Sequence, residues 1–336
     1  MSTSPYVLKE TSVTRVMTQV CLALVPGIAA YVWFIGPAIL VQLVIATIAA
    51  LVGEALILKL RSKPVGMFLT DGSAVVTAWL IALTFPPLVP WWLIFTGTLF
   101  AIIIAKHLYG GLGQNPFNPA MIAFAVCIVA FPALMSQWPN QNLHLPLTEQ
   151  LRVILGFAPH FDSLAGATPL DALKTALKQA DGTTTVAALL GNSELYGHIA
   201  GRGWEWISIA YLLGGLFLWQ RRIMTWHTPV AYIVGLTAIS GALWLYNPNE
   251  FANPLFHLLS GGAMLGAFFI VTDPVSGCTT PRGKLIFGAS AGLLTYIIRV
   301  FGGYPDGVAF AVLLMNIAAP LIDVLTQPPV FGMKNK

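Results

Sequence analysis

The 336-residue sequence carries a formal net charge of +4, and 57% of its residues are hydrophobic while only 9% are charged. Its mean hydropathy is +0.77. Soluble globular domains carry about 25% charged residues, so this composition excludes a water-soluble domain and indicates a polytopic membrane protein. The basic residues lie mostly in short loops, where they set membrane topology, so the net charge predicts no nucleic-acid partner.

Ten apolar segments follow one another along the chain, several of them near the roughly 20 residues that a membrane-spanning helix needs. They predict an all-α polytopic membrane protein of about ten transmembrane helices. The chain divides into a first five-span half over residues 1–134, a polar region over residues 135–205, and a second five-span half over residues 206–336. The predicted spans cover residues 16–33, 37–58, 73–85, 91–106, 119–134, 206–219, 230–246, 255–271, 285–300 and 308–325.

The distribution of Lys and Arg predicts the orientation, because loops rich in these residues resist translocation and stay in the cytoplasm. With ten spans, most of the basic residues near span ends fall on one side of the membrane. Both chain ends are then expected in the cytoplasm and the polar region in the periplasm, for a protein of the bacterial inner membrane. The residues on the cytoplasmic side are Lys9, Arg15, Lys59, Arg61, Lys63, Lys106, Arg221, Arg222, Arg282, Lys284, Lys334 and Lys336.

The two halves share a pattern of an aliphatic residue, Thr and Asp, which ends at Asp71 in the first half and at Asp273 in the second. An odd number of spans in each half inverts the second half in the membrane, as in transporters built from inverted repeats. Asn118-Pro119 and the segment from Asn316 to Pro320 form a looser second match. We therefore expect two inverted five-helix repeats.

Three carboxylates lie in or beside predicted spans, at Glu54, Asp71 and Asp273. Ionisable groups at membrane depth are costly and are functional candidates by default, so the three are candidates for an ion path. The alternative for Glu54 is a side chain that extends to the membrane surface, and for the two Asp residues it is helix capping. The six histidines are scattered without ligand spacing and are expected to be interfacial or loop residues. The three cysteines also lack ligand spacing, and no metal site is expected.

The polar region contains a segment rich in small residues around one hydroxyl, that of Thr168. A short helix is expected over residues 171–180, with Thr168 as its N-cap and Pro169 at its first position. The same helix start offers free backbone N–H groups to a phosphate. Thr168 is therefore either a capping residue alone or also an attachment point for a phosphate group.

The segment Asp162-Ser163-Leu164-Ala165-Gly166-Ala167-Thr168 resembles a flavinylation motif, in which FMN is joined through its phosphate to the threonine hydroxyl. Ala165 departs from that motif, which usually has Ser or Thr at its position. Further matching segments cover residues 4–6, 15–17, 69–74, 110–120 and 271–276. Over essentially the whole length, the sequence resembles the RnfD family, the D-type membrane subunits of the Rnf ion-translocating electron transport complex.

This resemblance implies a redox-driven ion pump subunit that is not catalytic alone. FMN would be held covalently on Thr168 as a phosphothreonine ester, with Asp162, Ser163, Gly166 and Ala167 around it, and a second, non-covalent flavin, riboflavin, would lie in the membrane part. The implied partners are the other Rnf subunits (A, B, C, E and G), membrane lipid, and a flavin transferase that makes the ester. Electrons would pass between reduced ferredoxin and NAD⁺, coupled to Na⁺ or H⁺ movement.

Two alternatives remain at this point. The NqrB subunit of the Na⁺-translocating NADH:quinone reductase shares most of the matching segments, although a longer amino-terminal extension would be expected there. A protein of another class, a non-redox channel or transporter for small solutes, would use Thr168 only as a cap.

Overall fold

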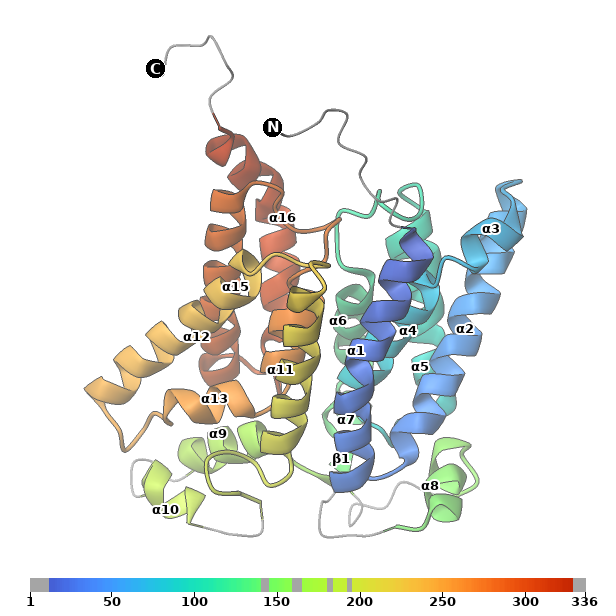
Figure 1. The fold of residues 1–336 in the computed structure, drawn as a ribbon. Coiled ribbons are helices and arrows are strands. Elements are labelled where there is room, and N and C mark those ends of the chain that lie inside the picture. Colours follow the sequence, from blue (N-terminus) through green and yellow to red (C-terminus); the bar gives the residue numbers. More distant parts are fainter. Residues whose placement is uncertain (1–11, 140–144, 159–164, 180–183, 192–194, 329–336) are drawn as a thin grey trace.

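The computed structural model describes residues 12–139, 145–158, 165–179, 184–191 and 195–328. It is mostly helical, and five of its helices are long and apolar enough to cross a membrane (Figure 1). The prediction of a helical polytopic membrane protein is therefore confirmed. The five helices are α1 (Val13–Phe34), α2 (Ala38–Leu60), α12 (His227–Tyr246), α15 (Pro281–Phe301) and α16 (Val308–Thr326).

The other predicted spans are shorter helices or broken ones. Three apolar helices are α4 (Ser73–Thr84), α6 (Pro119–Ala130) and α11 (Trp204–Gln220). A fourth, α5 (Trp91–Phe100), continues as the π-helix η1 (Ala101–His107). π-Helical turns are rare and are frequently found at functional sites.

The span predicted over residues 255–271 is wrong as one continuous helix. The structure divides it into α13 (Pro254–Leu259), α14 (Ala263–Leu265) and the π-helix η3 (Gly266–Ile270). The break lies at Gly261, whose φ of +62° is left-handed and favours glycine. Hydropathy cannot detect such a break because every residue around it is apolar or small.

The helices of the two predicted halves meet along the middle of the bundle. Helix α1 packs along α11, and α6 packs against α16, while α2 with α4 and α5, and α12 with α15, lie to either side (Figure 1). On α2, the side chains at positions 44, 48, 52 and 56 repeat every four residues and are all more than half exposed. An exposed apolar stripe of this kind suits contact with lipid chains.

The polar region forms short elements at one end of the bundle, whereas α1 begins and α16 ends at the opposite end, where α3 (Val65–Leu69) also lies (Figure 1). Strands β1 and β2 pair in antiparallel fashion, with Trp138 opposite Gly166. The helix predicted over residues 171–180 is confirmed as α9. The elements of this end are α7 (Pro132–Ser136), β1 (Trp138–Pro139), α8 (Leu147–Ile154), β2 (Ala165–Gly166), α9 (Pro169–Gln179) and α10 (Val186–Leu190).

Close backbone approach between α12 and α15 depends on glycine. A Cβ atom added at Gly292 of α15 would lie closer than 3.0 Å to the carbonyl oxygen of Tyr232, and one added at Gly235 of α12 would meet the carbonyl of Ala289 in the same way. Small residues at helix interfaces allow such approach in membrane proteins.

We therefore expect Gly292→Ala to push α12 and α15 apart and to lower the free energy of unfolding by about 1–3 kcal/mol, the usual cost of overpacking. The measurement is the apparent Tm of the purified protein in detergent. Gly66→Ala is the matched control, because a Cβ atom at Gly66 meets nothing within 4 Å. Equal Tm values for the two variants would contradict the expectation.

Candidate functional site

Thr168 immediately precedes α9, and one residue, Ala167, separates it from strand β2. Its side-chain oxygen accepts a hydrogen bond from the backbone N–H of Asp171 at 3.2 Å, and its carbonyl accepts one from Ala172 at 2.8 Å. Thr168 therefore caps the helix, with Pro169 as the first helical residue, as the sequence predicts. The residue is buried, with 8% of its surface exposed.

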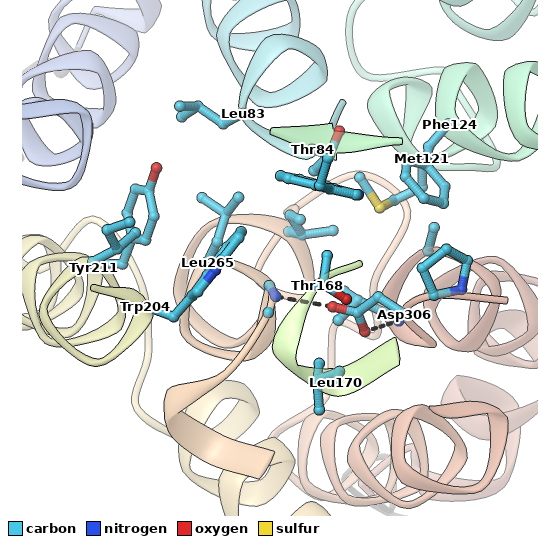
Figure 2. A pocket seen from close by; sticks show the side chains of 18 of the residues that line it. Leu83, Thr84, Met121, Phe124, Thr168, Leu170, Trp204, Tyr211, Leu265 and Asp306 are labelled. Carbon is cyan, nitrogen blue, oxygen red and sulfur yellow. Dashed lines mark hydrogen bonds between the residues drawn. The ribbon is translucent and has the colours of Figure 1, made fainter. Parts of the chain in front are cut away.

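The side chain of Thr168 lines a cavity that we call the threonine cavity (Figure 2). Its volume is about 70 Å³ and its walls are mainly aromatic or apolar. The rings of Trp138 and Trp204 meet edge to face, with centroids 5.4 Å apart, and Tyr31 meets Trp204 at 6.2 Å. Within the described part of the chain, the buried hydroxyls of Tyr31 and Tyr211 have no hydrogen-bond partner. The cavity thus offers stacking faces and two unused polar groups.

A buried ion pair lies at the wall of this cavity. Asp306, which lines the cavity (Figure 2), accepts hydrogen bonds from Arg299 through both carboxylate oxygens, at 2.7 and 3.1 Å, and from the backbone N–H of Gly262 at 2.9 Å. Burial alone would raise the pKa of the Asp306 carboxyl, but the Arg299 guanidinium and the backbone donors hold that pKa below its ordinary value. The carboxylate is therefore charged and fixed.

The other predicted flavin-site residues have separate positions. Gly166 pairs with Trp138 across the two strands and is half-buried, and Ala167 is exposed beside Thr168. Asp162 and Ser163 lie outside the described residues. Ala165 pairs with Pro139 through the backbone.

Glu54 lies in a buried network near the opposite end of the bundle. Its carboxylate oxygen Oε1 is 2.6 Å from Lys106 Nζ and 3.0 Å from His107 Nε2, and Lys106 also donates to Ser73 Oγ at 2.8 Å. All four residues are buried. The alternative that Glu54 extends to the membrane surface is therefore wrong.

The two basic residues of this network correct a further expectation. Sequence patterning places Lys106 among the loop charges that set topology and His107 among loop or interfacial residues. Both instead lie in the last turn of the π-helix η1, with only 2% and 4% of their surface exposed. The signal that could have revealed them is a Lys-His pair directly at the end of an apolar run, in a chain that also has a carboxylate within an apolar run.

Asp71 accepts a hydrogen bond at the start of α4, as the capping alternative predicts, whereas Asp273 stabilises a turn that no helix follows directly. Asp71 accepts the backbone N–H of Ser73 at 2.7 Å. Asp273 accepts the N–H of Val275 at 3.1 Å and the hydroxyl of Ser276 at 2.7 Å. The three carboxylates do not form one cluster, but Ser73 connects the network of Glu54 to Asp71.

A larger cavity, which we call the asparagine cavity, has a volume of about 340 Å³. Asn118, on its wall, donates its backbone N–H to Asn316 Oδ1 at 3.1 Å and its side-chain amide to the carbonyl of Ile270 at 3.4 Å. This contact brings together the looser pair of motifs in the two halves. The polar residues that line the cavity are Ser73, Thr77, Lys106, Asn115, Asn118, Thr272 and Asp273.

The sequence is similar to a known protein family over nearly its whole length. The model of the NQR2, RnfD, RnfE family matches residues 1–332. A protein of Pseudomonas aeruginosa (strain UCBPP-PA14), named as the D subunit of an ion-translocating oxidoreductase complex, is 50% identical over 331 residues, which cover 98% of this chain and 95% of the relative. Proteins of the same name from Escherichia fergusonii and Yersinia pseudotuberculosis are 47% and 46% identical, over 99% and 100% of this chain and 98% and 99% of theirs. The chain therefore belongs to the NQR2, RnfD, RnfE family.

Proposed function

We propose that this chain is the D-type membrane subunit of a redox-driven, ion-translocating oxidoreductase complex, and that it carries FMN esterified through its phosphate to the hydroxyl of Thr168. The observation that carries the proposal is the position of that hydroxyl, at a helix start and on the wall of an aromatic cavity between the two halves. The names of relatives at about 50% identity over nearly the whole chain support the assignment to such a complex.

The described residues fit an FMN group in three respects. The start of α9 presents backbone N–H groups and the positive end of a helix dipole, which favour a phosphate. The aromatic walls provide faces for a flavin ring, and the hydroxyls of Tyr31 and Tyr211 provide hydrogen-bond donors that the described residues leave unused. When bound, the flavin supplies the electron chemistry, and the protein sets its position and surroundings.

The fit also places two demands on the protein. A volume of about 70 Å³ is small beside the roughly 300–1,000 Å³ of usual ligand pockets, so side chains have to move for a flavin ring to enter. The hydroxyl of Thr168 is buried, so a transferase reaches it only when the start of α9 is displaced or before this segment packs. The ester would therefore form before or during closure of the threonine cavity.

A second, non-covalent flavin such as riboflavin fits the asparagine cavity by size. Its volume of about 340 Å³ lies within the range of small-molecule sites. Asn115 and Lys106 on its wall have amide and ammonium groups that can donate hydrogen bonds to flavin carbonyls.

The packing also supports the architecture of ten spans in two inverted repeats. The first helices of the halves, α1 and α11, pack together, and so do α6 and α16, the last spans of the two halves, which is compatible with a two-fold axis that passes between them. The parts would be residues 1–134, 135–205 and 206–336, with both termini cytoplasmic and Thr168 on the periplasmic side. A flavin retained by an ester would not be lost to the periplasm.

In this function the chain would relay electrons between its flavins and the neighbouring Rnf subunits (A, B, C, E and G), and ion movement would compensate the moving charge. Electrons would pass between reduced ferredoxin and NAD⁺, with Na⁺ or H⁺ as the coupling ion. Glu54 is the strongest of the three ion-path candidates, because it is held at depth by Lys106 whereas Asp71 and Asp273 are used in turns.

Two other functions, a non-redox solute channel and an NqrB subunit, differ from this one in cofactor or in partners. A non-redox solute channel would have no flavin, and an NqrB subunit of the Na⁺-translocating NADH:quinone reductase would function with other partners. The neighbouring genes separate the latter from an Rnf protein, since an iron–sulfur protein (RnfB) and an NADH-binding protein (RnfC) would accompany the Rnf chain.

We expect Thr168→Ala to abolish covalent flavin attachment, because the variant lacks the ester oxygen. The measurement is flavin fluorescence of the denatured band after electrophoresis, with the chain co-expressed with its flavin transferase. The matched control is Thr185→Ala, which removes the N-cap of the neighbouring helix α10, where Thr185 accepts the N–H of Ala188 at 3.3 Å.

Both variants lose a helix cap, at a cost of about 1 kcal/mol, so a general effect on folding would appear in both. A fluorescent Thr185→Ala band beside a dark Thr168→Ala band supports the proposal. A dark wild-type band would contradict it and favour the channel. Fluorescence retained by Thr168→Ala would move the ester to another residue.

The role of Glu54 can be tested apart from its role in folding. Glu54→Gln leaves the Lys106 charge buried and unpaired, so it should destabilise the protein by about 3–5 kcal/mol. The double variant Glu54→Gln/Lys106→Met removes both charges and should recover most of that loss. If Glu54 belongs to the ion path, the double variant should be stable and flavinylated but should not pump ions in proteoliposomes containing the whole complex.

Normal pumping by the stable double variant would place the ion path elsewhere. Arg61→Gln is a suitable control near the same end, because Arg61 donates to the carbonyl of His107 at 2.8 Å without contacting Glu54. This variant should pump normally.

If a second flavin is bound without a covalent bond, it should be released when the protein is denatured. Thr168→Ala should still release about one flavin per chain on denaturation, measured by chromatography of the supernatant. Leu80→Trp enlarges a side chain on the wall of the asparagine cavity and should reduce this released flavin, whereas Leu80→Met, which conserves volume, should not. Equal release from both Leu80 variants would exclude the asparagine cavity as the site.

A further inference from the structure

A third cavity, which we call the α9 cavity, lies on the side of α9 away from the threonine cavity. Its volume is about 290 Å³, and Leu170 lines both cavities. Its walls come from α9, from α13 and from the end of α15. The apolar side chains of the wall are Leu173, Leu177, Phe251, Phe256, Val300 and Phe301.

Two polar side chains in the wall, those of His257 and Tyr296, are buried without hydrogen-bond partners among the described residues. Among the described residues, neither ring nitrogen of His257 nor the hydroxyl of Tyr296 has a hydrogen-bond partner, although the two residues are 4% and 0% exposed. Their rings lie against each other, with centroids 4.8 Å apart. A buried donor without a partner costs roughly 1–3 kcal/mol, so an acceptor from outside the protein would be stabilising here.

The opening of the cavity is basic on one side and apolar on the other. Lys174 and Lys178 of α9 line it together with one carboxylate, Glu250. Lys174 contacts Asp171 at 3.4 Å and donates to the carbonyl of Tyr304 at 2.7 Å, whereas Lys178 is exposed and no ion pair or hydrogen bond of its side chain occurs among the described residues. On the apolar side, Phe301 at the end of α15 is 59% exposed.

This arrangement matches the layers of a bilayer boundary. The long apolar helix α15 ends at Phe301, and the polar helix α9 lies beside that end, so the cavity is at the level where acyl chains give way to ester groups and headgroups. We propose that the α9 cavity binds one anionic phospholipid. Its phosphate would lie at Lys178 and Lys174, its ester carbonyls would accept hydrogen bonds from His257 and Tyr296, and its acyl chains would leave past Phe301.

The experiment uses the full-length chain, purified in detergent and freed of lipid, with dioleoyl phosphatidylglycerol as the probe. Native mass spectrometry measures the bound lipid as a function of its concentration. Removal of one neutral hydrogen bond weakens binding about fivefold, so Tyr296→Phe should show that loss. Lys178→Gln should show a similar loss of about fivefold, as expected for one basic residue near an anionic lipid.

Matched controls are Tyr246→Phe and Lys63→Gln, which change the same residue types at exposed positions outside the cavity. Both should bind like the wild type. Equal affinity in the cavity variants and the controls would overturn the site, as would the absence of binding. If dioleoyl phosphatidylcholine bound as tightly as the anionic lipid, the proposed preference for anionic lipid would be wrong. If inorganic phosphate competed with the lipid, the cavity would be a site for a free anion and not for a lipid.

Covalent flavin fluorescence should persist in all four variants, because none of them alters Thr168 or the residues that line the threonine cavity. The lipid proposal and the flavin proposal can therefore fail independently. Size-exclusion elution identical to that of the wild type shows that each variant is folded.

Discussion

The ion pair between Arg299 and Asp306 holds together the part of the structure on which the candidate site depends. Arg299 extends from α15, contacts Asp306 at 2.7 Å and donates to the carbonyl of His257 at 2.6 Å. Asp306 in turn accepts backbone N–H groups at Gly262, in the break between α13 and α14, and at Gly307, before α16. This one ion pair therefore forms hydrogen bonds with backbone N–H and C=O groups at or near the ends of several helices. Lipid chains could not form hydrogen bonds with these groups.

The first half uses a comparable device near the other end of the bundle, where Lys106 neutralises Glu54 and holds Ser73 at the start of α4. Each pair joins separate helical segments, and each borders a cavity, Asp306 at the threonine cavity and Lys106 at the asparagine cavity. Breaking either pair by removal of one partner leaves a buried charge, which is strongly destabilising. These pairs place charged groups at the walls of cavities inside a bundle that otherwise has apolar packing.

The positions of the helices can be predicted because apolar patterning and capping are local properties, and the cap at Thr168 with Pro169 is the clearest example. The pairing of Glu54 with Lys106 cannot, because it joins residues 52 apart, and a Lys at the end of an apolar run normally reaches the membrane surface. The break at Gly261 escapes prediction because hydropathy contains no information on a left-handed backbone. The sequence places His257 among loop or interfacial residues, and only the tertiary packing shows that it is buried.

The two interpretations of Thr168, as a cap and as an attachment point, are compatible in this geometry. A free hydroxyl oxygen accepts the N–H of Asp171, and the helix start would present the same donors to phosphate oxygens once an ester is formed. Attachment of FMN would thus replace the hydroxyl oxygen of Thr168 as acceptor by charged phosphate oxygens, which are stronger acceptors, and α9 would stay capped. Because Leu170 lies between the threonine cavity and the α9 cavity, the position of this first helical turn depends on what occupies both sides of it.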